Sequence, residues 1–308
     1  MRSRSTIAAA CAAVAALFAA SPSAEALGVW STAVKVDEVA GNSDLINTPS
    51  LDGCPILSPD GRSLFMASNR PGGKGGLDIW VARRDSVDEP FGAPENLPAP
   101  INSAADDFCP TPLRGGRLLF VSRRVTEGVT CGMGDMYLTR RDPEHGWRAP
   151  QHLACAPAGP NSALDEQGPS YVEVDEDTEQ LFFSRSSGTV PGDLFVSTSA
   201  GDDFGAAAPV AELNSPGNDI QPNVRKNGQE IVFSSNHAYP GAQGTQDLYM
   251  ATRASTDDPW GPPVNLGPEI NTPAAESRPS LSWDGRTLLF GRAPGPEGSS
   301  DIYMSTRP

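Results

Sequence analysis

The chain has 308 residues, and its 38 acidic and 23 basic side chains give a formal net charge of −15. This charge excludes the basic surfaces on which proteins bind nucleic acid or anionic membranes. Its 31 glycines and 30 prolines are typical of a turn-rich β-protein, and its length allows a single domain with a full core.

Residues 1–26 have the pattern of a secretory signal. Arg2 and Arg4 precede an apolar stretch at 7–20, and Ala24-Glu25-Ala26 matches a cleavage site. The apolar stretch is shorter than the ~20 residues of a membrane span. We therefore expect a periplasmic or secreted mature chain, residues 27–308, that forms one domain and does not insert into a membrane. Cys11 leaves a lipid anchor as the alternative.

One sequence unit then occurs five times. Each copy begins with Asn followed by Ser or Thr, has an acid five residues after the Asn, and has Pro eight residues after it. The asparagines are Asn47, Asn102, Asn161, Asn214 and Asn271; the acids are Asp52, Asp107, Glu166, Asp219 and Glu276; the prolines are Pro55, Pro110, Pro169, Pro222 and Pro279. A repeat with a period of 53 to 59 residues indicates a propeller or solenoid.

Four short strands are predicted in each unit. The first follows the Pro, and turns such as Pro59-Asp60-Gly61 join it to an apolar second strand. A third strand opens with Asp, an aliphatic residue and an aromatic residue, and a fourth begins with an aromatic residue beside Gly. Five such units predict an all-β, five-bladed β-propeller with four-stranded blades.

The fifth unit stops at Pro308, after its third strand. Residues 29–40 contain the aromatic residue beside Gly and a partial alternation of valines. We expect this N-terminal segment to complete the last blade against 301–307, with Trp30 buried, because a closed ring leaves no unpaired blade edge.

At this point the repeat resembles the TolB-type, WD-like β-propeller family. That resemblance depends on Ser58-Pro59-Asp60-Gly61-Arg62 with Asp78-Ile79-Trp80 in the first unit, and on Ser282-Trp283-Asp284-Gly285-Arg286 with Asp301-Ile302-Tyr303 in the fifth. It covers nearly the whole mature chain and implies the propeller fold.

Four cysteines remain after the signal: Cys54, Cys109, Cys131 and Cys155. An even number in an exported chain indicates disulfides, and four cysteines allow three pairings. Cys54 and Cys109 hold the same position in neighbouring units, whereas the other two belong to the second unit. We predict Cys54–Cys109 and Cys131–Cys155. A zinc site is the alternative, but the cysteine spacings match no zinc pattern.

The acids Asp52, Asp107, Glu166, Asp219 and Glu276 are the candidate ligand or cation site, because each precedes an innermost strand and is expected near the central channel. We expect them mainly to fix the blade junctions, with Arg123, Arg185 and Arg292 as partners. Asp52 and Asp219 then have no arginine, and calcium bound there is the alternative. No other cofactor is expected.

The sequence contains no nucleophile elbow, phosphate loop or zinc-protease motif. We therefore expect a non-catalytic binding module that recognises a protein or glycan partner through the loops between second and third strands. The alternative is a five-bladed glycoside hydrolase with Asp52, Asp107 and Glu166 as catalytic carboxylates, since such enzymes use a carboxylate pair.

Overall fold

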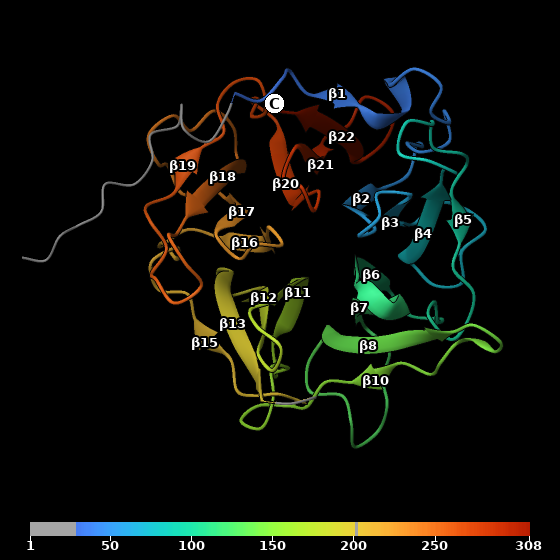
Figure 1. Ribbon diagram of the computed structural model, residues 1–308, viewed down its shortest axis with the longest axis vertical. Helices are drawn as coiled ribbons and strands as arrows, with labels where there is room; N and C mark the ends of the chain where they lie inside the picture. The colour runs from blue at the N-terminus through green and yellow to red at the C-terminus, as the bar shows by residue number, and fades with distance from the viewer. Residues whose placement is uncertain (1–28, 201–202) are drawn as a thin grey trace, which may run out of the picture.

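The computed structural model describes residues 29–200 and 203–308, so the predicted signal at 1–26 lies outside the described residues. Five antiparallel sheets stand around a central axis and form a five-bladed β-propeller, which confirms the predicted fold (Figure 1). Among the described residues, no helix has the length and apolar character needed to cross a membrane.

The blades follow one another along the chain, and each runs from the axis outward. The innermost strands are β2 (Asp52–Leu57), β6 (Asp107–Pro112), β11 (Asp165–Glu173), β16 (Asp219–Val224) and β20 (Ala275–Leu281). The second strands are β3 (Ser63–Ser68), β7 (Arg117–Ser122), β12 (Glu179–Ser186), β17 (Glu230–Ser235) and β21 (Thr287–Ala293). The third strands are β4 (Asp78–Arg83), β8 (Asp135–Asp142), β13 (Asp193–Ala200), β18 (Asp247–Thr252) and β22 (Asp301–Thr306). We number the blades 1 to 5 in this order.

The outer strands have two residues each: β5 (Glu95–Asn96), β10 (Gln151–His152), β15 (Ala208–Pro209), β19 (Val264–Asn265) and β1 (Val34–Lys35). Two further short strands, β9 (Gly146–Trp147) and β14 (Asp203–Phe204), pair with β8 and β13. Two 3-10 turns, η2 (Val36–Glu38) and η3 (Arg114–Gly116), complete the described elements.

The N-terminal segment closes the ring as expected. In β1, Val34 pairs with Met304 of β22, and the Ser31 N–H donates to the Thr306 carbonyl at 2.8 Å. Trp30 is buried, with 5% of its surface exposed. The strand is shorter than the predicted 29–40, because η2 turns the chain directly after Lys35.

The repeated Asn joins each blade to the blade before it. The Asn102 side chain accepts the Ile79 N–H and donates to the Ile79 carbonyl, both at 2.9 Å, so that it pairs with β4 as another strand would. Asn47 makes the same two bonds to Ile302 of the closing blade. Buried backbone groups require such partners. The outer strand of each blade is too short to cover the whole third strand. The side-chain amide of the repeated Asn therefore bonds the backbone groups of the third strand that the outer strand does not reach.

A β-bulge interrupts every innermost strand between its acid and its Pro. The bulge residue has a positive φ in each blade: Cys54 (46°), Cys109 (46°), Gly168 (59°), Gln221 (56°) and Arg278 (56°). These residues and the five repeated prolines line the axial channel. Proline is suited to this inner edge because it has no N–H that would need a partner strand.

Apolar side chains fill the spaces between blades. Phe120, Phe182, Phe233 and Phe290 of the second strands are almost completely buried. The third-strand aromatics, which the sequence places in the core, are buried at Trp80, Tyr137, Tyr249 and Tyr303 and partly buried at Phe195.

Candidate functional site

The five repeated acids lie at the blade junctions and not in the channel. Asp52, Asp107, Glu166, Asp219 and Glu276 have no exposed surface. The expected position at the channel is therefore wrong, because the bulge two residues further on turns a different side chain toward the axis. Each acid also donates its backbone N–H to a carbonyl of the preceding blade, as Asp52 does to Ser300 at 3.0 Å.

Four of these acids are paired with arginine. The pairs are Asp52 with Arg70 at 2.6 Å, Asp107 with Arg124 at 2.7 Å, Glu166 with Arg185 at 2.8 Å, and Glu276 with Arg292 at 2.7 Å. The sequence prediction named Arg185 and Arg292 correctly. It was wrong for blade 2, where Arg123 instead bridges Asp106 and Asp165, and for blade 1, where Arg70 serves Asp52.

Each acid also caps the turn that begins its repeat. Asp52 accepts the Thr48 N–H and hydroxyl at 2.7 and 2.8 Å, and Asp107 accepts the same two groups of Ser103 at 2.6 and 2.7 Å. Burial raises the pKa of Glu166 and of Glu276, although the hydroxyl and guanidinium partners of each oppose that shift. Carboxylates held in this way stabilise the junctions; of the four that are paired with arginine, only Glu166 has an oxygen, Oε2, without a hydrogen-bond partner among the described residues.

Asp219 in blade 4 is the exception. Its Oδ2 accepts the Ser215 N–H and hydroxyl at 2.6 and 2.7 Å, as in the other blades, but its buried Oδ1 has no hydrogen-bond partner among the described residues. The equivalent oxygens of Asp52 and Asp107 accept the arginine. Blade 4 has Ser235-Asn236-His237 where blade 1 has Ser68-Asn69-Arg70, so His237 replaces the arginine.

Tyr239 occupies the space that the arginine takes elsewhere. In blades 1 and 5, Arg70 and Arg292 lie over the third-strand aromatic ring, at 5.3 and 4.1 Å from its centroid. In blade 4, the Tyr239 ring contacts Tyr249 edge-on at 5.1 Å instead. Burial raises the pKa of Tyr239, and the negative charge of Asp219 raises it further. A neutral phenol therefore stands near this carboxylate in place of a cation.

The aspartates that open the third strands form a second ring, and one member again differs. Asp78, Asp135, Asp247 and Asp301 each accept backbone N–H groups of the loop before them, as Asp247 does from Gln243 and Gly244 at 2.7 and 2.8 Å. The blade 3 loop, 187–192, is shorter. The carboxyl group of Asp193 makes no hydrogen bond or ion pair with any residue that the structure describes.

The two exceptions are neighbours at the junction of blades 3 and 4. The Asp219 N–H donates to the Gly192 carbonyl at 2.8 Å, directly before Asp193. Burial raises the pKa of Asp193, and the charge of Asp219 raises it further. A groove of about 370 Å³ at this junction is lined by 187–191, 216–218 and Asn236; these segments adjoin Asp193 and Asp219 in the chain, and neither of the two aspartates lines the groove. This junction therefore has one half-exposed carboxyl with a raised pKa and one buried carboxylate without a cation.

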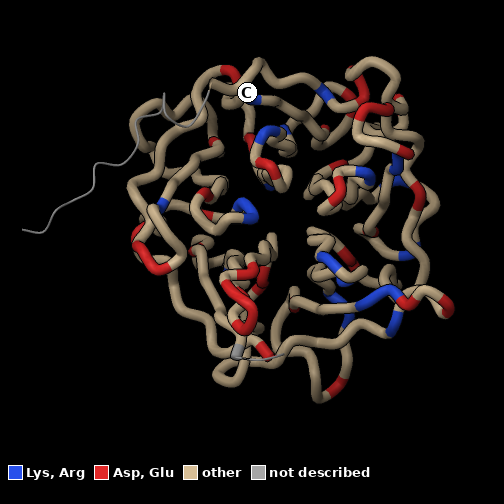
Figure 2. Tube along the Cα trace, in the orientation of Figure 1, with Lys and Arg blue, Asp and Glu red and all other residues tan. Residues whose placement is uncertain are grey.

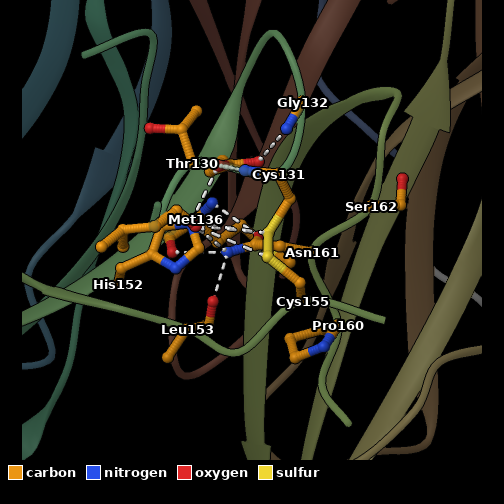
Figure 3. Close-up of a disulfide and its surroundings, with 12 residues drawn as sticks. Thr130, Cys131, Gly132, Met136, His152, Leu153, Cys155, Pro160, Asn161 and Ser162 are labelled. Atoms are coloured by element: carbon orange, nitrogen blue, oxygen red, sulfur yellow. Dashed lines mark hydrogen bonds and ion pairs between the residues drawn. A yellow bond between two sulfur atoms is a disulfide. The ribbon is translucent and has the colours of Figure 1, made fainter. Parts of the chain in front are cut away.

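The cysteines form Cys54–Cys109 across blades 1 and 2, and Cys131–Cys155 within blade 2, the two pairings expected from the sequence. Figure 3 shows the second disulfide beside His152 and Asn161. Cys131, His152 and Cys155 are also the only group of three possible metal ligands among the described residues, and its cysteines are joined to each other. None of the five repeated acids belongs to such a group, and the calcium expectation stays a prediction.

Comparison with known proteins finds the same fold in solved structures. No protein-family profile and no curated protein matches the sequence. The structure resembles the GH43 endo-arabinanase from Bacillus licheniformis, with 13% identity over 85% of this chain and 93% of that chain and a TM-score of 0.54. It also resembles an α-L-arabinofuranosidase from Lactobacillus brevis, with 11% identity, coverages of 87% and 93% and a TM-score of 0.55. The catalytic domain of a GH62 α-L-arabinofuranosidase from Coprinopsis cinerea matches at 16% identity, with coverages of 91% and 97% and a TM-score of 0.53.

These likenesses establish the fold, and they correct two expectations. The TolB-type assignment is wrong, because the similar solved structures are an endo-arabinanase and two α-L-arabinofuranosidases, and no family profile matches. The non-catalytic binding module is also the wrong choice of the two functions considered from the sequence, because the same structures favour the glycoside hydrolase.

The sequence contained a signal for the exceptional junction that was only partly used. It predicted that Asp219 has no arginine, which the structure bears out. Comparing Asn236-His237 with Asn69-Arg70 would have separated Asp219 from Asp52 at once. The departure at Asp193 had no such signal, because its Asp-Leu-Phe motif is intact.

Proposed function

We propose that this protein is an exported glycoside hydrolase, and that its acid–base chemistry is located at the junction of blades 3 and 4. The observation that carries the proposal is that Asp193 and Asp219, the two carboxyl groups that depart from their rings, lie at one blade junction, where the charge of Asp219 acts on Asp193 and the adjoining chain segments line a groove. Glycosidases need two carboxyl groups, one protonated as the acid and one ionised. The raised pKa of Asp193 suits it to the role of the acid.

Asp193 is the general acid in this proposal. It is half-exposed, and both its burial and the charge of Asp219 favour its protonated form. It donates its proton to the glycosidic oxygen as the bond to the sugar breaks. Asp219 is the ionised partner in this proposal. Its free Oδ1 acts as the second carboxylate of a glycosidase, which activates water or attacks the sugar. Since Asp219 is buried, Tyr239 or the adjoining loops must move for it to contact the sugar.

The carboxylates considered from the sequence, Asp52, Asp107 and Glu166, are less suited to catalysis. Each is buried and paired with an arginine within 2.8 Å. Both oxygens of Asp52 and of Asp107 accept hydrogen bonds, and the arginine beside Glu166 fixes its carboxylate charge.

The substrate class follows from the similar structures, whose names specify arabinan and arabinofuranoside hydrolysis. We propose a pentose-containing plant polysaccharide as the substrate, encountered outside the cytoplasm after removal of residues 1–26. The acidic surface is compatible with a neutral glycan, since acidic positions are spread over all five blades (Figure 2).

The test is hydrolysis of arabinan, arabinoxylan and xylan oligosaccharides by the mature protein and by Asp193→Asn, Asp219→Asn and Asp60→Asn. Asp60 lies in a hairpin turn at the opposite end of blade 1, and its variant is the matched control. We expect activity that falls ~10²–10⁴-fold in Asp193→Asn, as for loss of a general acid, and remains in Asp60→Asn. No activity on any glycan, with the fold intact, would contradict the proposed function. Activity that survives both junction substitutions would contradict the assigned residues alone.

A further inference from the structure

Only one of the five bulge residues that line the axial channel has a charged side chain. Of the five bulge residues, Cys54 and Cys109 are bonded to each other and Gly168 has no side chain, which leaves Gln221 and Arg278 as the polar groups. The repeated prolines and residues next to them complete the lining, and it includes no Asp or Glu. An acidic protein therefore has a channel lining whose charge is positive.

Arg278 has no counter-charge. Its guanidinium makes no hydrogen bond or ion pair with the residues that the structure describes, whereas Arg70, Arg124, Arg185 and Arg292 each bind a buried acid. Its side chain is half-buried in the channel, and burial lowers its pKa without any opposing negative charge. The side chain passes over Gly53 of blade 1, where an added Cβ would lie 2.5 Å from Nη1. A cation that is partly removed from water without a partner is unfavourable, and an anion that enters the channel would offset that cost.

Two amide groups of the channel lining, those of Gln221 and Asn223, also present donors. The Gln221 Oε1 accepts the Arg278 N–H at 3.1 Å, and the Asn223 Oδ1 accepts the Leu281 N–H at 2.8 Å. Because a backbone N–H can bond only to the amide oxygen, these contacts assign the orientation of both amides. The NH₂ groups of Gln221 and Asn223 then remain as donors. Among the described residues, the one hydrogen bond that either of them donates is from Gln221 Nε2 to Gln167 Oε1 at 3.5 Å.

We infer that the axial channel binds a small inorganic anion, of halide size, on Arg278 with the amide groups of Gln221 and Asn223. The channel space of about 30 Å³ at this position is large enough for one monatomic ion or a water molecule. The anion neutralises the guanidinium and links blades 4 and 5 at the axis. This site is separate from the junction of blades 3 and 4, and its test does not depend on enzymatic activity.

The first experiment measures thermal unfolding of the mature protein at constant ionic strength, with gluconate replaced stepwise by chloride or bromide. We expect a saturable rise in Tm, of about 5 °C at 100 times the Kd, because a ligand that binds only the folded state stabilises it. Arg278→Gln is the test variant, since Gln221 occupies the equivalent position with the same φ of 56°. It should fold and lose the halide dependence. Arg286→Gln, in an exposed turn, should retain it.

The second experiment needs no variant. Crystals of the wild-type protein soaked in bromide should give an anomalous peak beside the Arg278 guanidinium. A Tm that does not depend on the identity of the anion, halide dependence that persists in Arg278→Gln, or a channel that contains only water would each overturn the inference.

Discussion

The contrast between Asp52 and Asp219 gives a direct test of the junction chemistry. Both are fully buried aspartates at the same position of the repeat, and both cap a turn through the same two donors. Only Asp52 is paired with an arginine, at 2.6 Å, and that Arg70 side chain is itself 8% exposed. The same chemical change, Asp→Asn, should therefore have different effects at the two positions.

Asp52→Asn leaves the Arg70 guanidinium buried without its counter-charge, although its bonds to the Leu45 and Ile46 carbonyls at 2.7 Å remain. Removing one partner of a buried ion pair costs about 3–5 kcal/mol. For a chain of this size, 1 kcal/mol corresponds to about 2 °C in Tm, so we expect a fall of about 6–10 °C. Asp219→Asn removes a buried charge that has no cation, and its free energy of unfolding should change by less than about 1 kcal/mol.

Differential scanning calorimetry and urea unfolding of the two variants measure this difference. An unchanged m-value would show that the denatured states are comparable. Equal losses at both positions would refute the reasoning, because they would mean that Asp219 has a cationic partner in solution or that Arg70 contributes nothing to Asp52.

Three further predictions follow from the described contacts. Trp30→Ala should destabilise the closed ring by about 3–5 kcal/mol, the cost of a large buried aromatic, and a Tm within 2 °C or so of wild type would contradict closure by the N-terminal segment. Replacing both Cys131 and Cys155 by Ser opens a crosslink across 24 residues and should cost about 3 kcal/mol, measured by urea unfolding against the oxidised wild type. The pKa of Asp193 is raised in the folded state, so the unfolded chain loses this proton at a lower pH than the folded chain does. The free energy of unfolding therefore falls as pH rises from about 4 to the folded-state pKa. Asp193→Asn should remove that loss, so its stability relative to wild type should increase with pH over this interval and not decrease.

The repeat could be interpreted from sequence because each of its features has a local physical cause. Gly61 and Gly285 adopt the positive φ, 69° and 72°, that their hairpin turns require. The apolar second strands alternate with turn signals, and buried strands need such runs. The incomplete fifth unit and the matching segment at the other terminus then predicted closure, because an open blade would leave an unpaired edge.

The position of a side chain relative to the axis could not be predicted in the same way. The acids were expected at the channel, but a bulge after each of them turns Cys54, Gln221 and Arg278 inward instead. The stretch from each acid to its Pro is too short for a period-2 pattern to show which residue forms the bulge.

The sequence by itself determined the five-bladed ring, its closure, the structural role of most of the repeated acids and the pairing of the cysteines, because these depend on spacing that recurs in every blade. Only the tertiary structure decided which members of each ring lack their usual partner. Asp193 and Asp219 are 26 residues apart in the chain, and Arg278 lines a channel built from all five blades. Such departures arise from contacts between blades, where the neighbour that completes or omits a hydrogen bond comes from a distant part of the chain.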